Sequence, residues 1–265
     1  IPELAVPREI TNFKSDLIDL IEKKKNEGKV QHVSVYFRDL NNGPWFGINQ
    51  DDTFSPGSLL KVPLLISYLK QSEKNEMILS EKIQITDVDN LNEIIKPKKS
   101  AVLGKEYSVE DLLGMMIIYS DNVSTYNLLE FDKFEDKEIV YKDLGLPLPS
   151  NDNFLTVRQY ASFFRILFNA SYLSRDNSEK ALKLMSGVDF RDGLVAGVGE
   201  NVEVSHKFGE REDGSSAQFH DCGIIYYPKR PYMLCIMTGG TDPKLLIGTI
   251  RDISKFVYDK VDQSQ

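Results

Sequence analysis

The spacing of apolar and polar residues predicts strands near both ends of the chain and helices in the middle. Apolar positions recur at helical spacing over 10–29, where Thr11 is the expected N-cap. They alternate over 30–49 around an Asn-Asn-Gly turn, which predicts a β-hairpin. Helical spacing dominates 56–193, with Ser108 and Asp111 as a capping box and Thr156 as a further N-cap. The last part predicts strands in 202–208, 217–227 and 231–240 and a helix at about 243–260.

Pairing of the two early strands with the three late ones gives a fold of the α/β (α+β) class. The strands form one five-stranded antiparallel sheet, the terminal helices flank it, and the middle of the chain is an inserted all-helical domain. We therefore predict a discontinuous sheet domain of residues 1–56 and 197–265, and a helical domain of residues 57–196. Ser58 lies where the chain crosses between them, and clefts between domains are common ligand sites.

Composition narrows the possible partners. The 265 residues, 41% of them hydrophobic, can bury a core without a metal or a disulfide. A formal net charge of −8 argues against nucleic-acid binding, which needs a basic surface. No apolar run reaches the roughly 20 residues of a membrane span. Because the chain starts at Ile1 and not at Met, we expect that a signal or anchor segment was removed upstream.

The two cysteines, Cys222 and Cys235, lie in two strands that a tight turn joins. A disulfide between them needs a particular register, so we favour two buried free thiols. Their spacing is not that of a metal site, and no cofactor is predicted.

The segment FSPGSLLKVPLL, residues 54–65, places a serine and a lysine one helical turn apart. Side chains at i and i+3 share a helix face, so Ser58 and Lys61 can touch, and a serine needs such a neighbouring base to become a nucleophile. A lysine can serve as this base when burial or a nearby cation lowers its pKa. Ser67 and Lys70 repeat the spacing without a supporting motif, and we interpret them as surface residues.

Two more short motifs follow in the chain. Ser120, Asp121 and Asn122 come after an apolar helix, and Lys207 precedes Gly209 at the start of the last strands. Each has a structural alternative, because Ser, Asp and Asn cap helices well and Lys207 could be an exposed strand residue. The occurrence of all three motifs in this order and in these structural contexts favours a catalytic site over three unrelated structural roles.

The order S-x-x-K, S-D-N, K-x-G resembles that of class A β-lactamases and penicillin-binding proteins. The resemblance covers nearly the whole chain and implies an α/β sandwich with a helical second domain. It implies that Ser120 passes a proton to the leaving nitrogen, that Asn122 binds the substrate amide, and that the amides of Ser58 and Glu210 stabilise the oxyanion. The expected catalytic residues are Ser58, Lys61, Ser120 and Lys207, and the expected substrate-binding residues are Asn122, Phe208, Gly209 and Glu210.

The sequence departs from that family in two places. No E-x-x-L-N segment follows Ser120, although its glutamate activates the deacylating water in class A enzymes, and the pair Leu91-Asn92 precedes the S-D-N motif. Phe208 replaces the usual hydroxyl residue that helps to hold a substrate carboxylate, and Glu210 adds a like charge that Arg211 could offset. Slow deacylation and altered substrate recognition follow as hypotheses.

Three functions remain open. The leading one is a monomeric, extracytoplasmic serine acyl hydrolase that forms an acyl-enzyme at Ser58 with a small-molecule, amide, ester or peptidoglycan-derived substrate. The first alternative is a true class A β-lactamase, in which Glu138 or Asp152 replaces the missing glutamate. The second alternative is a non-catalytic cell-wall binding module on the same fold.

Overall fold

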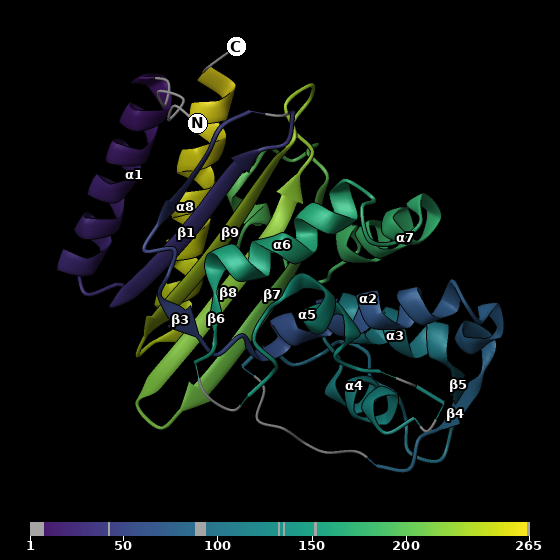
Figure 1. The fold of residues 1–265 in the computed structure, drawn as a ribbon. Helices are drawn as coiled ribbons and strands as arrows, with labels where there is room; N and C mark the ends of the chain where they lie inside the picture. Colours follow the sequence, from purple (N-terminus) through teal and green to yellow (C-terminus); the bar gives the residue numbers. More distant parts are fainter. Residues whose placement is uncertain are drawn as a thin grey trace.

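A computed structural model describes residues 8–41, 43–87, 94–131, 133–134, 136–150 and 153–263. Its centre is a five-stranded antiparallel sheet with the strand order β2-β1-β9-β8-β7 (Figure 1). The sheet therefore joins the first hairpin to the last three strands, as the sequence predicted. Its strands are β1 (His32–Asp39), β2 (Trp45–Ile48), β7 (Val204–Asp213), β8 (Ser216–Ile225) and β9 (Tyr232–Gly240).

Helices cover both faces of this sheet. The terminal helices α1 (Arg8–Asn26) and α8 (Pro243–Gln263) pack together on one face, and α6 (Val157–Phe168) lies across the other (Figure 1). The strands are buried along most of their length for this reason, and β9 is buried at every position. Helix α1 begins three residues before Thr11, so the prediction that Thr11 is its N-cap was wrong.

The middle of the chain is mainly helical, and two short ladders are added to it. β3 (Thr53–Phe54) pairs with β6 (Leu155–Thr156), and β4 (Lys82–Gln84) pairs with β5 (Glu106–Ser108). The division of the chain into domains at 56 and 197 stays a prediction. The helical segments are η1 (Gly57–Leu60), α2 (Lys61–Ser72), η2 (Glu76–Ser80), α3 (Val109–Ile118), α4 (Asn122–Leu129), α5 (Ile139–Leu144), α7 (Arg175–Ser186) and η3 (Val195–Gly197).

Local sequence signals explain where several elements begin. Ser108 and Asp111 form a capping box at the start of α3, and Thr156 caps α6 by accepting a hydrogen bond from the Gln159 amide. Both N-caps were predicted. β7 runs five residues beyond the predicted end at Phe208, because its polar continuation lies at the edge of the sheet and pairs with β8.

Cys222 and Cys235 are buried free thiols, as predicted. They face each other in the register of β8 and β9. Burial raises the pKa of the Cys222 thiol well above its usual value, which keeps that thiol protonated.

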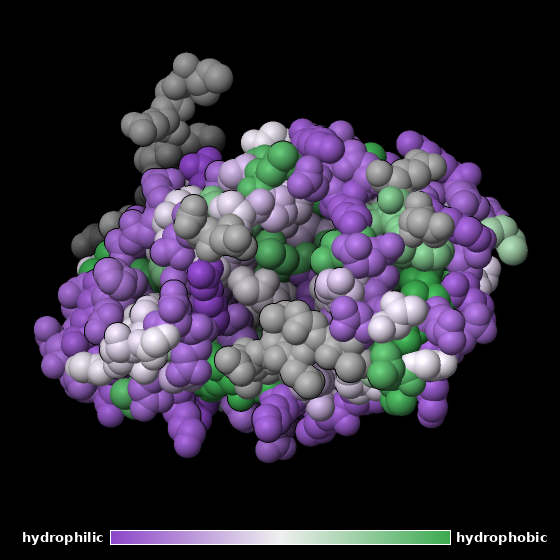
Figure 2. Space-filling model, turned by 90° about the horizontal axis from the view of Figure 1, so that it is seen from below, coloured by the Kyte–Doolittle hydropathy of each residue, from purple (hydrophilic) through white to green (hydrophobic). Residues whose placement is uncertain are grey.

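The surface agrees with the charged composition. Hydrophilic residues cover most of the face that Figure 2 shows, and apolar residues lie between them in separate patches. Among the described residues, no helix is both long enough and apolar enough to cross a bilayer.

Candidate active site

A pocket of about 670 Å³ lies where η1 and α2 meet β7, α4 and α5. It collects residues that are far apart in the sequence. The S-x-x-K and S-D-N motifs line it, and the K-x-G motif lies behind it, where Lys207 bonds to Ser120. The predicted site residues that line it are Ser58, Lys61, Ser120, Asn122 and Glu210.

Lys61 lies at the first position of α2 and its side chain is buried. Its ammonium group donates to the backbone oxygen of Ser120 at 2.5 Å, to Ser120 Oγ at 3.0 Å and to Asn122 Oδ1 at 2.7 Å. An ammonium group has three donors, so these contacts account for three hydrogen bonds. Lys61 thus joins the S-x-x-K motif to the S-D-N motif.

Lys207 reaches the same serine from the other side. It lies in β7, is fully buried, and donates to Ser120 Oγ at 2.9 Å and to the backbone oxygen of Phe208 at 2.9 Å. Because Lys61 bonds to the same oxygen, the two lysine nitrogens are separated by no more than the sum of the two distances, 5.9 Å. Ser120 Oγ accepts both bonds with its two lone pairs, so its proton is directed at a third group.

The backbone around Ser120 is held in an uncommon conformation. Ser120 has a φ of +58°, in the left-handed region that residues other than glycine seldom adopt and that is frequent at functional sites. The buried Asp121 is the N-cap of α4 and fixes the neighbouring chain. Its carboxylate accepts hydrogen bonds from the amides of Ala101, Val123 and Ser124 and from the hydroxyls of Ser100 and Ser124. The capping alternative therefore holds for Asp121, whereas Ser120 and Asn122 bind Lys61.

Two glycines allow η1 to approach β7. Gly57 has a φ of +52°, and a Cβ built on it would lie 2.2 Å from the backbone oxygen of Glu210. A Cβ on Gly209 would lie 2.3 Å from the backbone oxygen of Pro56. Only glycine fits at either position. The close approach brings the backbone of Ser58 beside that of Glu210, which are the two residues expected to supply the oxyanion amides.

Phe208 is not among the described residues that line this pocket, and its predicted role in substrate binding needs correction. The side chain is 2% exposed, and its ring centroid lies 4.7 Å from that of Phe190 and 5.9 Å from that of Phe219. Burial of an aromatic ring against other rings stabilises the fold, so Phe208 is a core residue. Gly209 likewise contributes by its close approach to η1 and not by lining the pocket.

The charged residues after Gly209 have partners of their own. The carboxylate of Glu210 accepts from the backbone amide of Ile95 at 3.0 and 3.1 Å. Arg211 Nη1 donates to Ser55 Oγ at 2.9 Å. Glu210 and Arg211 thus bind the backbone at Ile95 and the side chain of Ser55, and both also line the pocket.

The segment around α5 forms a wall that the sequence reading mostly missed. Lys137, Tyr141 and Pro149 line the pocket, and no motif marks them. Glu138, which was named as a replacement for the missing glutamate, also lines it, and its carboxylate lies 3.7 Å from Lys142 Nζ. Asp152, the other replacement named, and the pair Leu91-Asn92 lie outside the described residues.

The second S-x-x-K pair does not line the pocket. The interpretation of Ser67 as a surface residue was wrong. Ser67 is 1% exposed and donates a hydrogen bond to the backbone oxygen of Pro63 at 3.0 Å. Lys70 is half-buried, pairs with Glu73 at 3.1 Å and donates to the backbone oxygen of Tyr172. The serine lies inside the protein because the whole of this helix face packs against its neighbours.

Known proteins match this chain in sequence and in fold. A profile of the beta-lactamase enzyme family matches residues 12–261. Beta-lactamase VEB-1 of Pseudomonas aeruginosa is 23% identical over 246 residues, which cover 82% of this chain and 80% of that protein.

Solved structures resemble the chain along most of its length. A beta-lactamase from Chitinophaga pinensis has a TM-score of 0.82 at 19% identity, covering 94% of this chain and 99% of its own. A mutant of PBP-A, solved as an acyl-enzyme complex with penicillin G, has a TM-score of 0.79 at 20% identity, covering 98% of this chain and 100% of its own. At these identities the likeness establishes the fold.

Proposed function

The chain belongs to the beta-lactamase enzyme family, and from this premise we propose that it is a serine acyl hydrolase that forms its acyl-enzyme at Ser58. The observation that carries the proposal is the convergence of two buried lysines on Ser120 Oγ in the pocket that Ser58 lines. Nucleophilic catalysis by a serine needs a base and a proton donor near the nucleophile, and Lys61 and Ser120 line the same pocket as Ser58.

The proposed acylation moves protons among Ser58, Lys61, Ser120 and Lys207. This step requires a neutral Lys61, which keeps two of its three hydrogen bonds and uses its lone pair to take the hydroxyl proton as Ser58 Oγ attacks the acyl carbonyl carbon. Ser120 gives its proton to the leaving nitrogen as the carbon–nitrogen bond breaks, and Lys61 or Lys207 restores that proton through the hydrogen bonds they make to Ser120 Oγ. The products are an ester at Ser58 and a free amine.

The negative charge that develops on the carbonyl oxygen needs donors that are already in place. We assign this role to the backbone amides of Ser58 and Glu210, because Gly57 lets these two segments approach closely. One such donor typically contributes about 10²- to 10³-fold in rate.

Deacylation is proposed to be slow. Water must attack the ester at Ser58, and the segment after Ser120 lacks the E-x-x-L-N motif whose glutamate activates that water in class A enzymes. The structural similarity to PBP-A, for which a penicillin G acyl-enzyme has been solved, makes a penicillin a suitable probe. A peptidoglycan-like amide or ester is the proposed natural substrate, and such a substrate implies an extracytoplasmic location.

Intact-protein mass spectrometry with a fluorescent penicillin tests the proposal. We expect an adduct on the unaltered chain that persists for hours and is absent from Ser58→Ala. The matched control is Ser67→Ala, which removes the serine of the second S-x-x-K pair and should leave the adduct intact. No adduct on the unaltered chain would instead favour the non-catalytic cell-wall module.

A second candidate function is true β-lactamase turnover. The observation in its favour is that Glu138 lines the pocket, where a carboxylate could activate water. The adduct would then be transient, the drug would be consumed in many turnovers, and Glu138→Gln would convert the transient adduct into a persistent one. An adduct that is equally persistent with and without Glu138→Gln would exclude this function for Glu138.

A further inference from the structure

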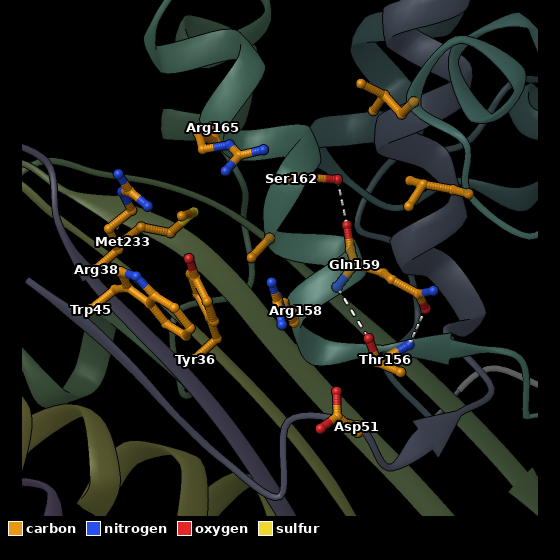
Figure 3. Close-up of a pocket in the computed structure, with 13 residues that line it drawn as sticks. Tyr36, Arg38, Trp45, Asp51, Thr156, Arg158, Gln159, Ser162, Arg165 and Met233 are labelled. Atoms are coloured by element: carbon orange, nitrogen blue, oxygen red, sulfur yellow. Dashed lines mark hydrogen bonds between the residues drawn. The ribbon is translucent and has the colours of Figure 1, made fainter. Parts of the chain in front are cut away.

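A second pocket, of about 510 Å³, lies between the sheet and α6 (Figure 3). Side chains of β1 and β2 form one wall, and side chains of α6 form the opposite wall. The volume falls within the range of about 300–1,000 Å³ that is common for small-molecule sites. None of its lining residues belongs to the three motifs, so the proposed acyl transfer does not account for it.

Three arginines line this pocket in a protein that is acidic as a whole. They are Arg38 of β1 and Arg158 and Arg165 of α6, and Asp51 is the one carboxylate among the described lining residues. Within the described part of the chain, no carboxylate lies within ion-pair distance of any of these guanidinium groups. Guanidinium groups bind carboxylates and phosphates through paired hydrogen bonds. The pocket is therefore suited to an anion.

Aromatic side chains form the wall opposite α6. Trp45 stacks on Tyr36, with ring centroids 5.7 Å apart, and remains 42% exposed. The Arg158 guanidinium lies 5.5 Å from the centroid of the Trp45 ring, within the distance of a cation–π interaction. The apolar face of a sugar or another flat ring gains dispersion energy against such an exposed aromatic surface.

Polar groups complete the lining. Asp51 and Gln159 bring an acceptor and an amide to the pocket, and Ser162 brings a hydroxyl. A sugar hydroxyl both donates and accepts hydrogen bonds, so it can use all three. The lining matches an anionic sugar: the arginines suit a carboxylate, the aromatic wall suits the face of a sugar ring, and the polar groups suit its hydroxyls.

We propose that this pocket binds a sugar that carries a free carboxylate, such as N-acetylmuramic acid whose lactyl carboxyl bears no stem peptide. The choice of a cell-wall sugar rests on the proposed function, whereas the preference for an anionic sugar rests on the pocket alone. Leu144, at the end of α5, lines this pocket, and Tyr141 of α5 lines the candidate active site. Helix α5 therefore borders both pockets.

The test measures binding without any turnover. Trp45 is the single tryptophan of the chain, so tryptophan fluorescence reports on this pocket directly. N-acetylmuramic acid is titrated into the Ser58→Ala chain, and N-acetylglucosamine, which lacks the lactyl carboxylate, is the matched neutral ligand. Inorganic phosphate is the third ligand and tests for a simple anion site.

We expect a saturable fluorescence change with N-acetylmuramic acid and at least about tenfold weaker binding of N-acetylglucosamine. The double variant Arg158→Gln/Arg165→Gln should weaken binding of N-acetylmuramic acid by about tenfold or more, and Arg175→Gln, an exposed arginine of α7, should not.

No saturable change, equal binding of the two sugars, or phosphate binding as tight as that of N-acetylmuramic acid would each overturn the proposal. Because Ser58→Ala cannot form an acyl-enzyme, these results are independent of the mass-spectrometric test of the proposed function. Failure of the sugar to bind therefore leaves that function standing, and loss of the penicillin adduct leaves this site standing.

Discussion

Gly57→Ala tests whether the close approach of η1 to β7 sets the acylation rate. The added Cβ would lie 2.2 Å from the backbone oxygen of Glu210, whereas ordinary contact begins at 3.4 Å. The two segments must therefore separate by about 1 Å, and a misplacement of this size can cost about 10²-fold in rate. The φ of +52° adds about 1–2 kcal/mol of strain to the folded state.

The assay separates the loss of rate from the loss of stability. The acylation rate comes from the time course of the penicillin adduct in intact-protein mass spectra, and the free energy of unfolding comes from urea titration. We expect Gly57→Ala to acylate about 10²-fold more slowly while it remains folded at the temperature of the assay.

Gly28→Ala is the matched control, because Gly28 also has a positive φ, +70°, but no atom lies within 4 Å of its added Cβ. This variant should lose about 1 kcal/mol of stability and keep its acylation rate. A normal rate in Gly57→Ala would refute the reasoning about the oxyanion amides. An equal loss of rate in Gly28→Ala would show that the effect is general destabilisation.

Two further predictions follow from buried groups. Ser120→Ala should slow acylation by about 10²- to 10⁴-fold, because it removes the hydroxyl to which both lysines donate hydrogen bonds. The control Ser72→Ala removes a buried hydroxyl of α2 and should keep the acylation rate. Equal rates in the two variants would contradict this prediction. Burial lowers the pKa of His220 from 6.5 to about 4, so the unfolded chain takes up a proton below pH 6.5 that the folded chain refuses. The contribution of His220 to the free energy of unfolding should be complete above about pH 6.5 and should fall by up to about 1.4 kcal/mol per pH unit down to about pH 4. Urea titrations at several pH values should show this slope for the unaltered chain and not for His220→Gln. Equal slopes in the two proteins would contradict the prediction.

The sheet and its helices were predictable because their signals are local. Alternation marks the strands, 3.6-residue spacing marks the helices, and capping residues such as Ser108 and Thr156 mark where helices begin. The polar end of β7 gave no such signal, since an edge strand needs no apolar residues there. The hydrogen bonds between β7 and β8 determine where β7 ends, and these bonds depend on the register of the two strands.

The candidate site was predictable in part. Short motifs named Lys61, Ser120 and Asn122, and the structure brings these three residues into hydrogen-bond contact. The positive φ of Ser120 has no local signal, because it depends on bonds from Lys61 and from the neighbouring cap. The wall around Tyr141 was missed for a related reason: a pocket wall needs only a position in space, and no particular residue type.

In the proposed mechanism, Phe208 removes a hydroxyl that could bind substrate and leaves the contacts of Lys207 in place. Lys207 bonds to the backbone oxygen of residue 208, and any side chain there offers that oxygen. The hydroxyl that the family usually places at 208 is replaced by a ring in the core, so it cannot hold a substrate carboxylate. Arg211 lines the pocket and carries the charge that a carboxylate needs, although it also bonds to Ser55. In the proposed mechanism, acylation at Ser58 and recognition of a carboxylate therefore depend on different residues, so substrate preference can change while Ser58, Lys61 and Lys207 stay the same.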